Sequence, residues 1–136
     1  LLSRGLGDVY KRQLQEGLQD GTIDAICSHH EPLAKTAKQA PFAECKPGIS
    51  NFDTFMGLAC QLVKEGILTP EQLVEKIALN PAKIAGIETS YHQTGGAVLV
   101  DPSLTWTVTK ESIISQGKNT PFINSELTGK VEQVYF

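Results

Sequence analysis

The sequence has no long hydrophobic run, no dominant charge and no regular cysteine spacing. Its 12 Lys and Arg are scattered among 15 Asp and Glu, for a formal net charge of −3, which argues against a nucleic-acid partner. No apolar run approaches the roughly 20 residues that span a bilayer, so we predict neither a membrane segment nor a signal peptide. Cys27, Cys45 and Cys60 are odd in number and lack C-x-x-C spacing, which predicts free thiols in a reducing compartment, the cytoplasm.

The remaining composition is that of a globular protein, with 40% hydrophobic and 20% charged residues. The first part of the chain is an exception. Residues 8–13 are similar to an in-frame translation of the transposon mosaic-end adapter used in sequencing libraries. We therefore expect residues 1–13 to be a non-native segment and the natural sequence to start near Leu14. The chain is then expected to be a fragment of a longer reading frame.

Secondary structure is predicted to begin with the end of a helix, at 14–21, where Asp20-Gly21 is a stop signal. Residues 22–27 are short, mostly apolar and rich in β-branched side chains, which predicts a strand covered on both faces in a parallel sheet. The next residues, 28–48, are polar and contain three prolines, which predicts a long loop.

Three helices are expected in succession after this loop. Ser50 and Asp53 form a candidate capping pair for the first helix, which Gly66 ends. A capping box with a proline in the first turn, Thr69–Gln72, predicts the second helix. The third, shorter helix is expected from Asn80-Pro81 until Gly86 stops it.

Strand patterns return near the end of the chain. Ala97–Val100 is a continuous apolar run that we expect Asp101-Pro102 to end. Trp106–Val108 alternates, with Trp106 expected in a core, and Val131–Phe136 resembles a final strand. Between them, Leu127–Gly129 is expected to be a turn.

Residues 28–33, Ser-His-His-Glu-Pro-Leu, follow the predicted strand. They resemble the Asp-His-Ala-Pro-His motif of dihydroorotases and related cyclic-amide hydrolases at His30 and Pro32. His29 stands at the position of the motif's first Asp, and Leu33 stands at that of its last His. The outline of a catalytic motif is present, but two of its functional side chains are replaced.

Three further motifs resemble the same family in the same order. Ala40-Pro41-Phe42 with Pro47-Gly48 is similar to its substrate loop, Leu79–Ile84 to its Leu-Asn-Pro-Ala helix, and Asn119–Phe122 to its terminal segment. The resemblance implies an α/β fold: a C-terminal fragment of a metal-dependent-hydrolase (β/α)8 barrel. It places the last strand, loop and closing helices at 14–94, and strands of the flanking small β-sandwich at 95–136.

In active family members the motif's Asp accepts a proton from metal-bound water, a task for an anionic carboxylate. His29 carries no negative charge, and Leu33 removes a hydrogen bond to the substrate carboxylate of about 1.5 to 3 kcal/mol. We therefore predict no catalytic residue. The alternative for the loop residues among the expected pocket remnants is that they serve loop packing or an interface. The expected pocket remnants are His30, Pro32, Leu33, Ala40, Pro41, Phe42, Pro47 and Gly48.

A His29-His30-Glu31 zinc site is a weaker interpretation. Adjacent side chains of an extended backbone point to opposite sides, so at most one histidine can face a pocket. We expect one imidazole to line the former pocket and the other to hydrogen-bond the loop. No metal ligand and no cofactor is therefore predicted in this chain.

The resemblance implies a cytoplasmic, oligomeric, non-catalytic dihydroorotase-like protein of pyrimidine biosynthesis that supports assembly of aspartate carbamoyltransferase catalytic chains. The alternative is an active enzyme that hydrolyses the cyclic amide of dihydroorotate to N-carbamoyl-L-aspartate, with zinc held by residues outside this chain. A hydantoinase-like or allantoinase-like protein is a third, less favoured interpretation. The fragment alone is expected to be inactive and to melt broadly, because one strand of eight encloses no site.

Overall fold

The computed structural model describes residues 2–87 and 96–135, with side chains from residue 9 onward; His92 lies outside this part. The chain forms two compact units, Leu1–Cys27 with Leu62–Gly96, and Ser28–Gln61 with Ala97–Tyr135. The predicted division at 1–13, 14–94 and 95–136 stays a prediction. No helix among the described residues is long and apolar enough to cross a membrane.

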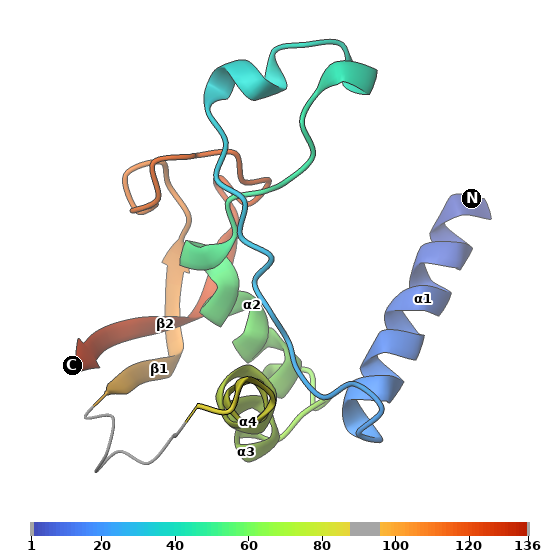
Figure 1. The fold of residues 1–136 in the computed structure, drawn as a ribbon, viewed down its shortest axis with the longest axis vertical. Helices are drawn as coiled ribbons and strands as arrows, with labels where there is room; N and C mark the ends of the chain where they lie inside the picture. Colours follow the sequence, from blue (N-terminus) through green and yellow to red (C-terminus); the bar gives the residue numbers. More distant parts are fainter. Residues whose placement is uncertain (1, 88–95, 136) are drawn as a thin grey trace. The chain divides into compact units, whose positions relative to one another are not determined.

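The first unit begins with helix α1 (Leu2–Gln19), which ends just before Gly21 at a φ of 85°, as the stop signal predicts. The expected strand at 22–27 is not formed (Figure 1). This segment hydrogen-bonds to helical carbonyls instead, from Ile23 N to Gly17 O at 2.8 Å and from Ile26 N to Lys76 O at 2.9 Å. A β-ladder needs a neighbouring strand, and the described part of this unit provides none.

The capping box predicted at Thr69 is confirmed. Thr69 N donates to Gln72 Oε1 at 2.9 Å, and Gln72 N donates to Thr69 Oγ1 at 3.2 Å. Helix α3 (Pro70–Val74) then passes through a π-helical turn, η3 (Glu75–Leu79), into α4 (Asn80–Ala85). The wide turn precedes Pro81, which has no N–H for a regular helical bond. Gly86 ends the run at a φ of 67°, as expected.

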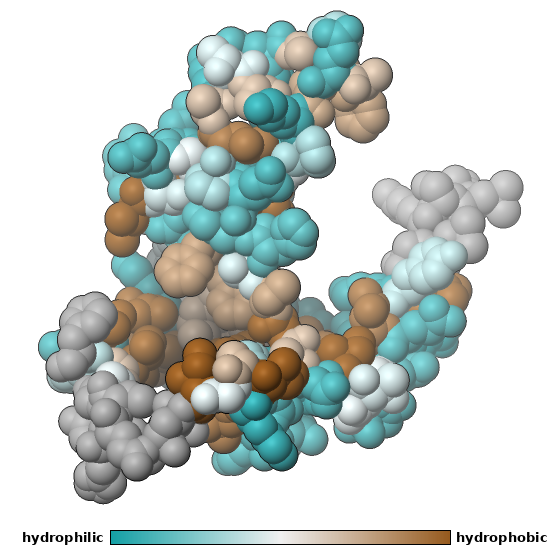
Figure 2. Space-filling view, in the orientation of Figure 1, coloured by the Kyte–Doolittle hydropathy of each residue, from teal (hydrophilic) through white to brown (hydrophobic). Residues whose placement is uncertain are grey.

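The helices of the first unit leave large hydrophobic side chains at the surface. Figure 2 shows hydrophobic residues over α4, where Ile84 is 70% exposed, and Ile87 beyond it is 62% exposed. Val74 and Leu79 are also exposed. These side chains gain little from burial in this chain, which is the physical reason for the predicted broad melting.

The second unit contains an antiparallel hairpin of β1 (Ala97–Thr107) and β2 (Glu126–Tyr135). The expected end of a strand at Asp101-Pro102 is wrong, because β1 continues past a register shift between Asp101 and Thr105. Asp101 Oδ1 accepts from Ser103 N at 2.8 Å and from Ser103 Oγ at 2.6 Å, which stabilises the irregular segment. The expected turn at Leu127–Gly129 is also wrong, because these residues lie within β2.

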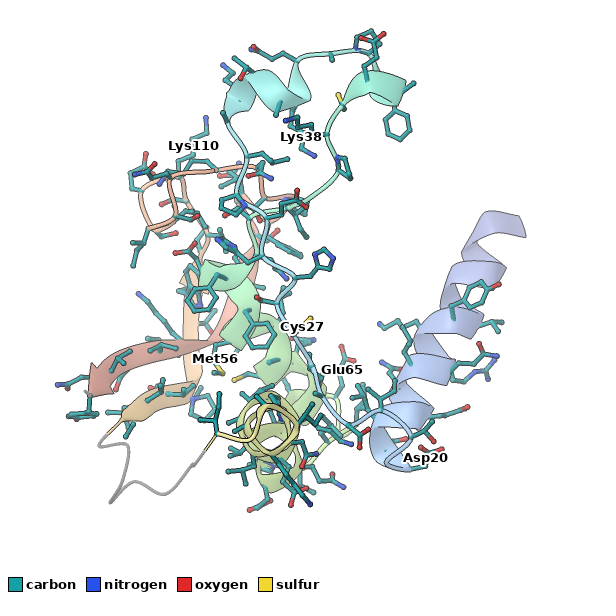
Figure 3. The ribbon with its side chains drawn as sticks, in the orientation of Figure 1. Asp20, Cys27, Lys38, Met56, Glu65 and Lys110 are labelled. Carbon is teal, nitrogen blue, oxygen red and sulfur yellow. The ribbon has the colours of Figure 1, made fainter. Side chains whose placement is uncertain are left out.

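Helix α2 (Phe52–Lys64), whose first ten residues belong to the second unit, contacts this hairpin at Gly57 and Cys60 (Figures 1 and 3). A Cβ on Gly129 would lie 2.6 Å from the Cβ of Cys60, and a Cβ on Gly57 would lie 3.1 Å from Gly129 O. The two glycines therefore allow the helix and the strand to approach closely. Trp106, half-buried, donates from Nε1 to Gly129 O at 3.0 Å.

Candidate functional site

The candidate site is the signature turn, defined here as Ser28–Leu33, which lies in the second unit. His30 forms a single parallel bridge with Ile49, and Glu31 N donates to Ile49 O at 2.9 Å. His29 has a φ of 44°, in the left-handed region. The backbone at His29 is therefore not extended, although the expectation that the two histidines point to opposite sides assumes an extended backbone. The side chain of His29 is exposed.

The imidazole of His30 is directed at the start of α2. Its Nδ1 accepts hydrogen bonds from Asn51 N at 3.1 Å and Phe52 N at 3.0 Å. Its Nε2 lies 3.3 Å from Ser115 Oγ, and its ring contacts Phe52 edge-on, with centroids 5.8 Å apart. Because a backbone N–H can only donate, Nδ1 carries a lone pair, and the proton of the neutral ring is on Nε2.

The expected capping pair at the start of α2 is wrong. Ser50 Oγ is buried without a hydrogen-bond partner, as is Asp53 Oδ2. Asp53 Oδ1 accepts instead from Ile114 N, at 2.8 Å. The sequence correctly predicts a helix here but not the residue that satisfies its first amides, because that residue lies about twenty positions earlier in the chain.

Asn119 holds the signature turn from the other side. Its Oδ1 accepts from Leu33 N at 2.7 Å, and its Nδ2 donates to Glu31 O at 3.0 Å and to Gly48 O at 3.1 Å. Its carbonyl accepts from Ser50 N at 3.1 Å. The predicted terminal motif and the signature turn are therefore brought together by one side chain.

Two glycines make room for this arrangement. Gly48 has a φ of 114°, and a Cβ there would lie 2.5 Å from Glu31 Oε2. A Cβ on Gly117 would lie 2.5 Å from Leu33 N and 2.7 Å from Pro32 Cα, both backbone atoms. Sequence reasoning included Gly48 but missed Gly117 and Ser115, because nothing in their sequence neighbourhood signals a distant contact.

The remaining expected pocket residues lie on the loop of residues 34–48, which contains the 3-10 turns η1 (Lys35–Lys38) and η2 (Phe42–Glu44). Phe42 is 98% exposed, and Pro41 and Pro47 are exposed. Ala40 O accepts from Cys45 Sγ at 3.0 Å, a contact within the loop. Lys38 (Figure 3) likewise bonds within the loop. Gly48 contacts the signature turn, whereas Ala40 contacts its own loop.

The described residues contain no group of three or more His, Cys, Asp and Glu side chains that could hold a metal ion. Both ring nitrogens of His30 already have partners. A zinc site built from His29, His30 and Glu31 would therefore have only the imidazole of His29. All three cysteines are free, and burial raises the pKa of the Cys60 thiol, which keeps it protonated. The described residues do not by themselves fit a zinc ion.

The polar groups of the signature turn thus form hydrogen bonds that fix the backbone. The side chains at the two altered positions, 29 and 33, have no group suited to bind or hydrolyse a cyclic amide. Position 29 presents an exposed imidazole, and position 33 presents an alkyl side chain. Neither provides an anionic base or a charged hydrogen bond to a carboxylate.

Comparisons with known proteins agree on the family of relatives. No family model matches this chain. It is 42% identical over 121 residues to a dihydroorotase of Syntrophus aciditrophicus (strain SB), across 87% of this chain and 28% of the relative. It is 41% identical over 119 residues to a dihydroorotase of Geobacter metallireducens, across 85% of this chain and 28% of the relative. The chain therefore spans about 28% of the length of these relatives.

Two solved structures share the fold. A D-hydantoinase matches with a TM-score of 0.72 and 21% identity, over 89% of this chain and 28% of that one. The inactive dihydroorotase-like domain of the Chaetomium thermophilum CAD-like multifunctional protein matches with a TM-score of 0.64 and 20% identity, over 92% of this chain and 33% of that one. The predicted fold class is confirmed: a mixed α/β piece of the fold of these hydrolases.

Proposed function

We propose that this chain belongs to the dihydroorotase family, like the relatives that it matches, and that it comes from a longer, non-catalytic member that supports assembly of aspartate carbamoyltransferase. One observation carries this proposal. The signature turn is held by His30 and Asn119, yet its catalytic position is His29 and its substrate position is Leu33.

The chemistry of the two altered positions supports loss of hydrolysis. A base next to metal-bound water has to favour a proton by its negative charge, and the neutral imidazole of His29 provides none. Leu33 cannot donate to a carboxylate, which removes about 1.5 to 3 kcal/mol of binding, about a 10- to 150-fold loss of affinity. The two replacements leave the signature turn without the family's proton-accepting carboxylate and without its hydrogen-bond donor to the substrate carboxylate.

The proposed partner is the aspartate carbamoyltransferase catalytic chain, in a cytoplasmic oligomer of the pyrimidine pathway. A structural neighbour is described as an inactive dihydroorotase-like domain of a multifunctional protein, so in that protein the fold is present without activity. The same separation of fold from catalysis is what we propose for this protein.

The test uses the full-length protein supplied with zinc. We expect no measurable ring hydrolysis or ring closure, and we expect co-purification with the transcarbamoylase. The double variant H29D/L33H restores the family's side chains and is the matched comparison for activity. Robust hydrolysis by the unaltered protein together with no association would overturn the proposal.

An active zinc dihydroorotase is the second candidate, favoured by the name of relatives that are 42% and 41% identical to this chain. Zinc would then be held by residues outside this chain, because the described residues do not fit it. The discriminating observation is the preceding sequence, in which active members have a His-x-His after the first strand, a bridging Lys or Asp and two further His. Finding this whole set, with zinc in the purified protein, would favour this candidate.

A further inference from the structure

We propose that His30 is a positioning residue: its imidazole caps helix α2 through Nδ1 and anchors residues 113–119 through Nε2. This role is structural and involves neither metal binding nor proton transfer. It does not rest on the proposed function, because the cap is needed whether or not the longer protein is active. His30 belongs to a motif that resembles a catalytic one, so its role has to be argued from its contacts.

The first step is that α2 has amides that need an acceptor. The first N–H groups of a helix have no partner within it and are normally satisfied by an Asn, Asp, Ser or Thr side chain at the N-cap. Here Asn51 is the residue before the helix, but its Oδ1 accepts from Thr54 Oγ1 at 3.0 Å. The acceptor for the amides of Asn51 and Phe52 is Nδ1 of His30.

The second step is that the same bonds exclude other uses of the ring. A histidine binds zinc through a nitrogen with a free lone pair. The lone pair of Nδ1 is directed at two N–H groups, and Nε2 carries the proton that faces Ser115 Oγ. Binding a metal at Nε2 would move the proton to Nδ1, which would then face the amides of Asn51 and Phe52 as a second donor.

The third step is that the cap also fixes the turn. Asn51 Nδ2 donates to Ser28 O at 3.1 Å, so the start of α2 and the start of the signature turn are joined in both directions. His30 lies between positions 29 and 33, and Ser115 joins it to the segment that carries Asn119. Loss of the imidazole is therefore expected to loosen the helix start and the turn together.

The test compares two amides at position 30 in the 136-residue chain. His30→Asn places an amide oxygen near the position of Nδ1, whereas His30→Gln extends its amide toward the position of Nε2. We expect His30→Asn to keep hydrogen-exchange protection at the amides of Asn51 and Phe52. We expect His30→Gln to lower it about 5- to 30-fold, the equivalent of an N-cap of about 1 to 2 kcal/mol. The control is His29→Gln, an identical change at the adjacent exposed histidine, which should leave both amides unchanged.

A second measurement does not depend on any variant folding. Nitrogen-15 NMR of the unaltered chain should show His30 with an unprotonated Nδ1 and a protonated Nε2, and equimolar Zn²⁺ should leave both signals in place. An Nδ1–H tautomer, a His30 shift on adding Zn²⁺, or equal protection in His30→Asn and His30→Gln would overturn the proposal.

Discussion

Asn119→Ala is the substitution whose effect the structure specifies most fully. It removes an acceptor from Leu33 N and two donors, one to Glu31 O and one to Gly48 O. A protein hydrogen bond contributes about 0.5 to 1.5 kcal/mol net, and the released groups are exposed enough for water to reach them. At about 0.7 to 1 kcal/mol for each of these partly exposed bonds, the three together should stabilise the turn by about 2 to 3 kcal/mol.

The reporter for this change is the amide of Glu31, whose own hydrogen bond to Ile49 O is left intact by the substitution. If the turn opens locally, its hydrogen exchange should accelerate about 30- to 150-fold, since each 1.4 kcal/mol corresponds to about a factor of ten. Asn80→Ala is the control. It removes one side-chain bond, from Asn80 Nδ2 to Asp24 O in the first unit, and should leave the exchange of Glu31 unchanged.

Asn119→Asp separates the two halves of the interaction. The carboxylate keeps an acceptor for Leu33 N but places a negative oxygen beside the carbonyls of Glu31 and Gly48. We expect exchange at Glu31 at least as fast as in Asn119→Ala. Unchanged exchange at Glu31 in both variants would refute the assignment of Asn119 as the residue that holds the turn.

Three further outcomes are expected. Gly117→Ala should accelerate hydrogen exchange at the Glu31 amide about 5- to 150-fold, the equivalent of about 1 to 3 kcal/mol, because its Cβ would meet the backbone of Leu33; unchanged exchange would contradict this. His29→Val should be about 1 to 2 kcal/mol less stable than His29→Gly, because φ is 44° there; equal stability would contradict this. Hydrogen bonds from the Ser103 hydroxyl and then its amide lower the pKa of Asp101. The contribution of these hydrogen bonds to stability is therefore present above about pH 3.9 and lost as the pH falls through the folded pKa of Asp101. The NMR chemical shift of the Ser103 amide should follow this titration, and a shift that does not change with pH would contradict the prediction.

The features that the sequence predicts correctly are those decided by contacts within a few residues. The capping box at Thr69–Gln72 and the stop at Gly86 each involve contacts within a few residues, so their residue types are enough to predict them. The exposed loop at 28–48 could also be predicted, because its prolines and polar residues disfavour regular elements. Of these features, only the loop contains part of the candidate site.

Elements whose hydrogen-bonding partner is distant in the sequence or absent could not be predicted from the sequence. Residues 22–27 have the composition of a buried parallel strand, but strand formation depends on neighbouring strands, and the described residues of this unit form none. Asp101-Pro102 is a typical strand end by composition. There β1 continues because its residues 105–107 pair with residues 126–128 of β2 beyond the irregular segment. In each case tertiary context overrode a local preference.

The signature turn, Ser28–Leu33, has features that the sequence predicts and contacts that it does not. Family resemblance pointed to His30 and Asn119, but their hydrogen bonds join residues 21 to 88 positions apart, which no local pattern reports. The side chains at His29 and Leu33 take no part in those bonds, since Leu33 contributes its backbone N–H. The side chains at 29 and 33 can therefore change without loss of those bonds, whereas a residue at position 30 that offers no acceptor leaves the amides of Asn51 and Phe52 without one. The presence of His30 consequently reports on folding, and within the signature turn only positions 29 and 33 bear on catalysis.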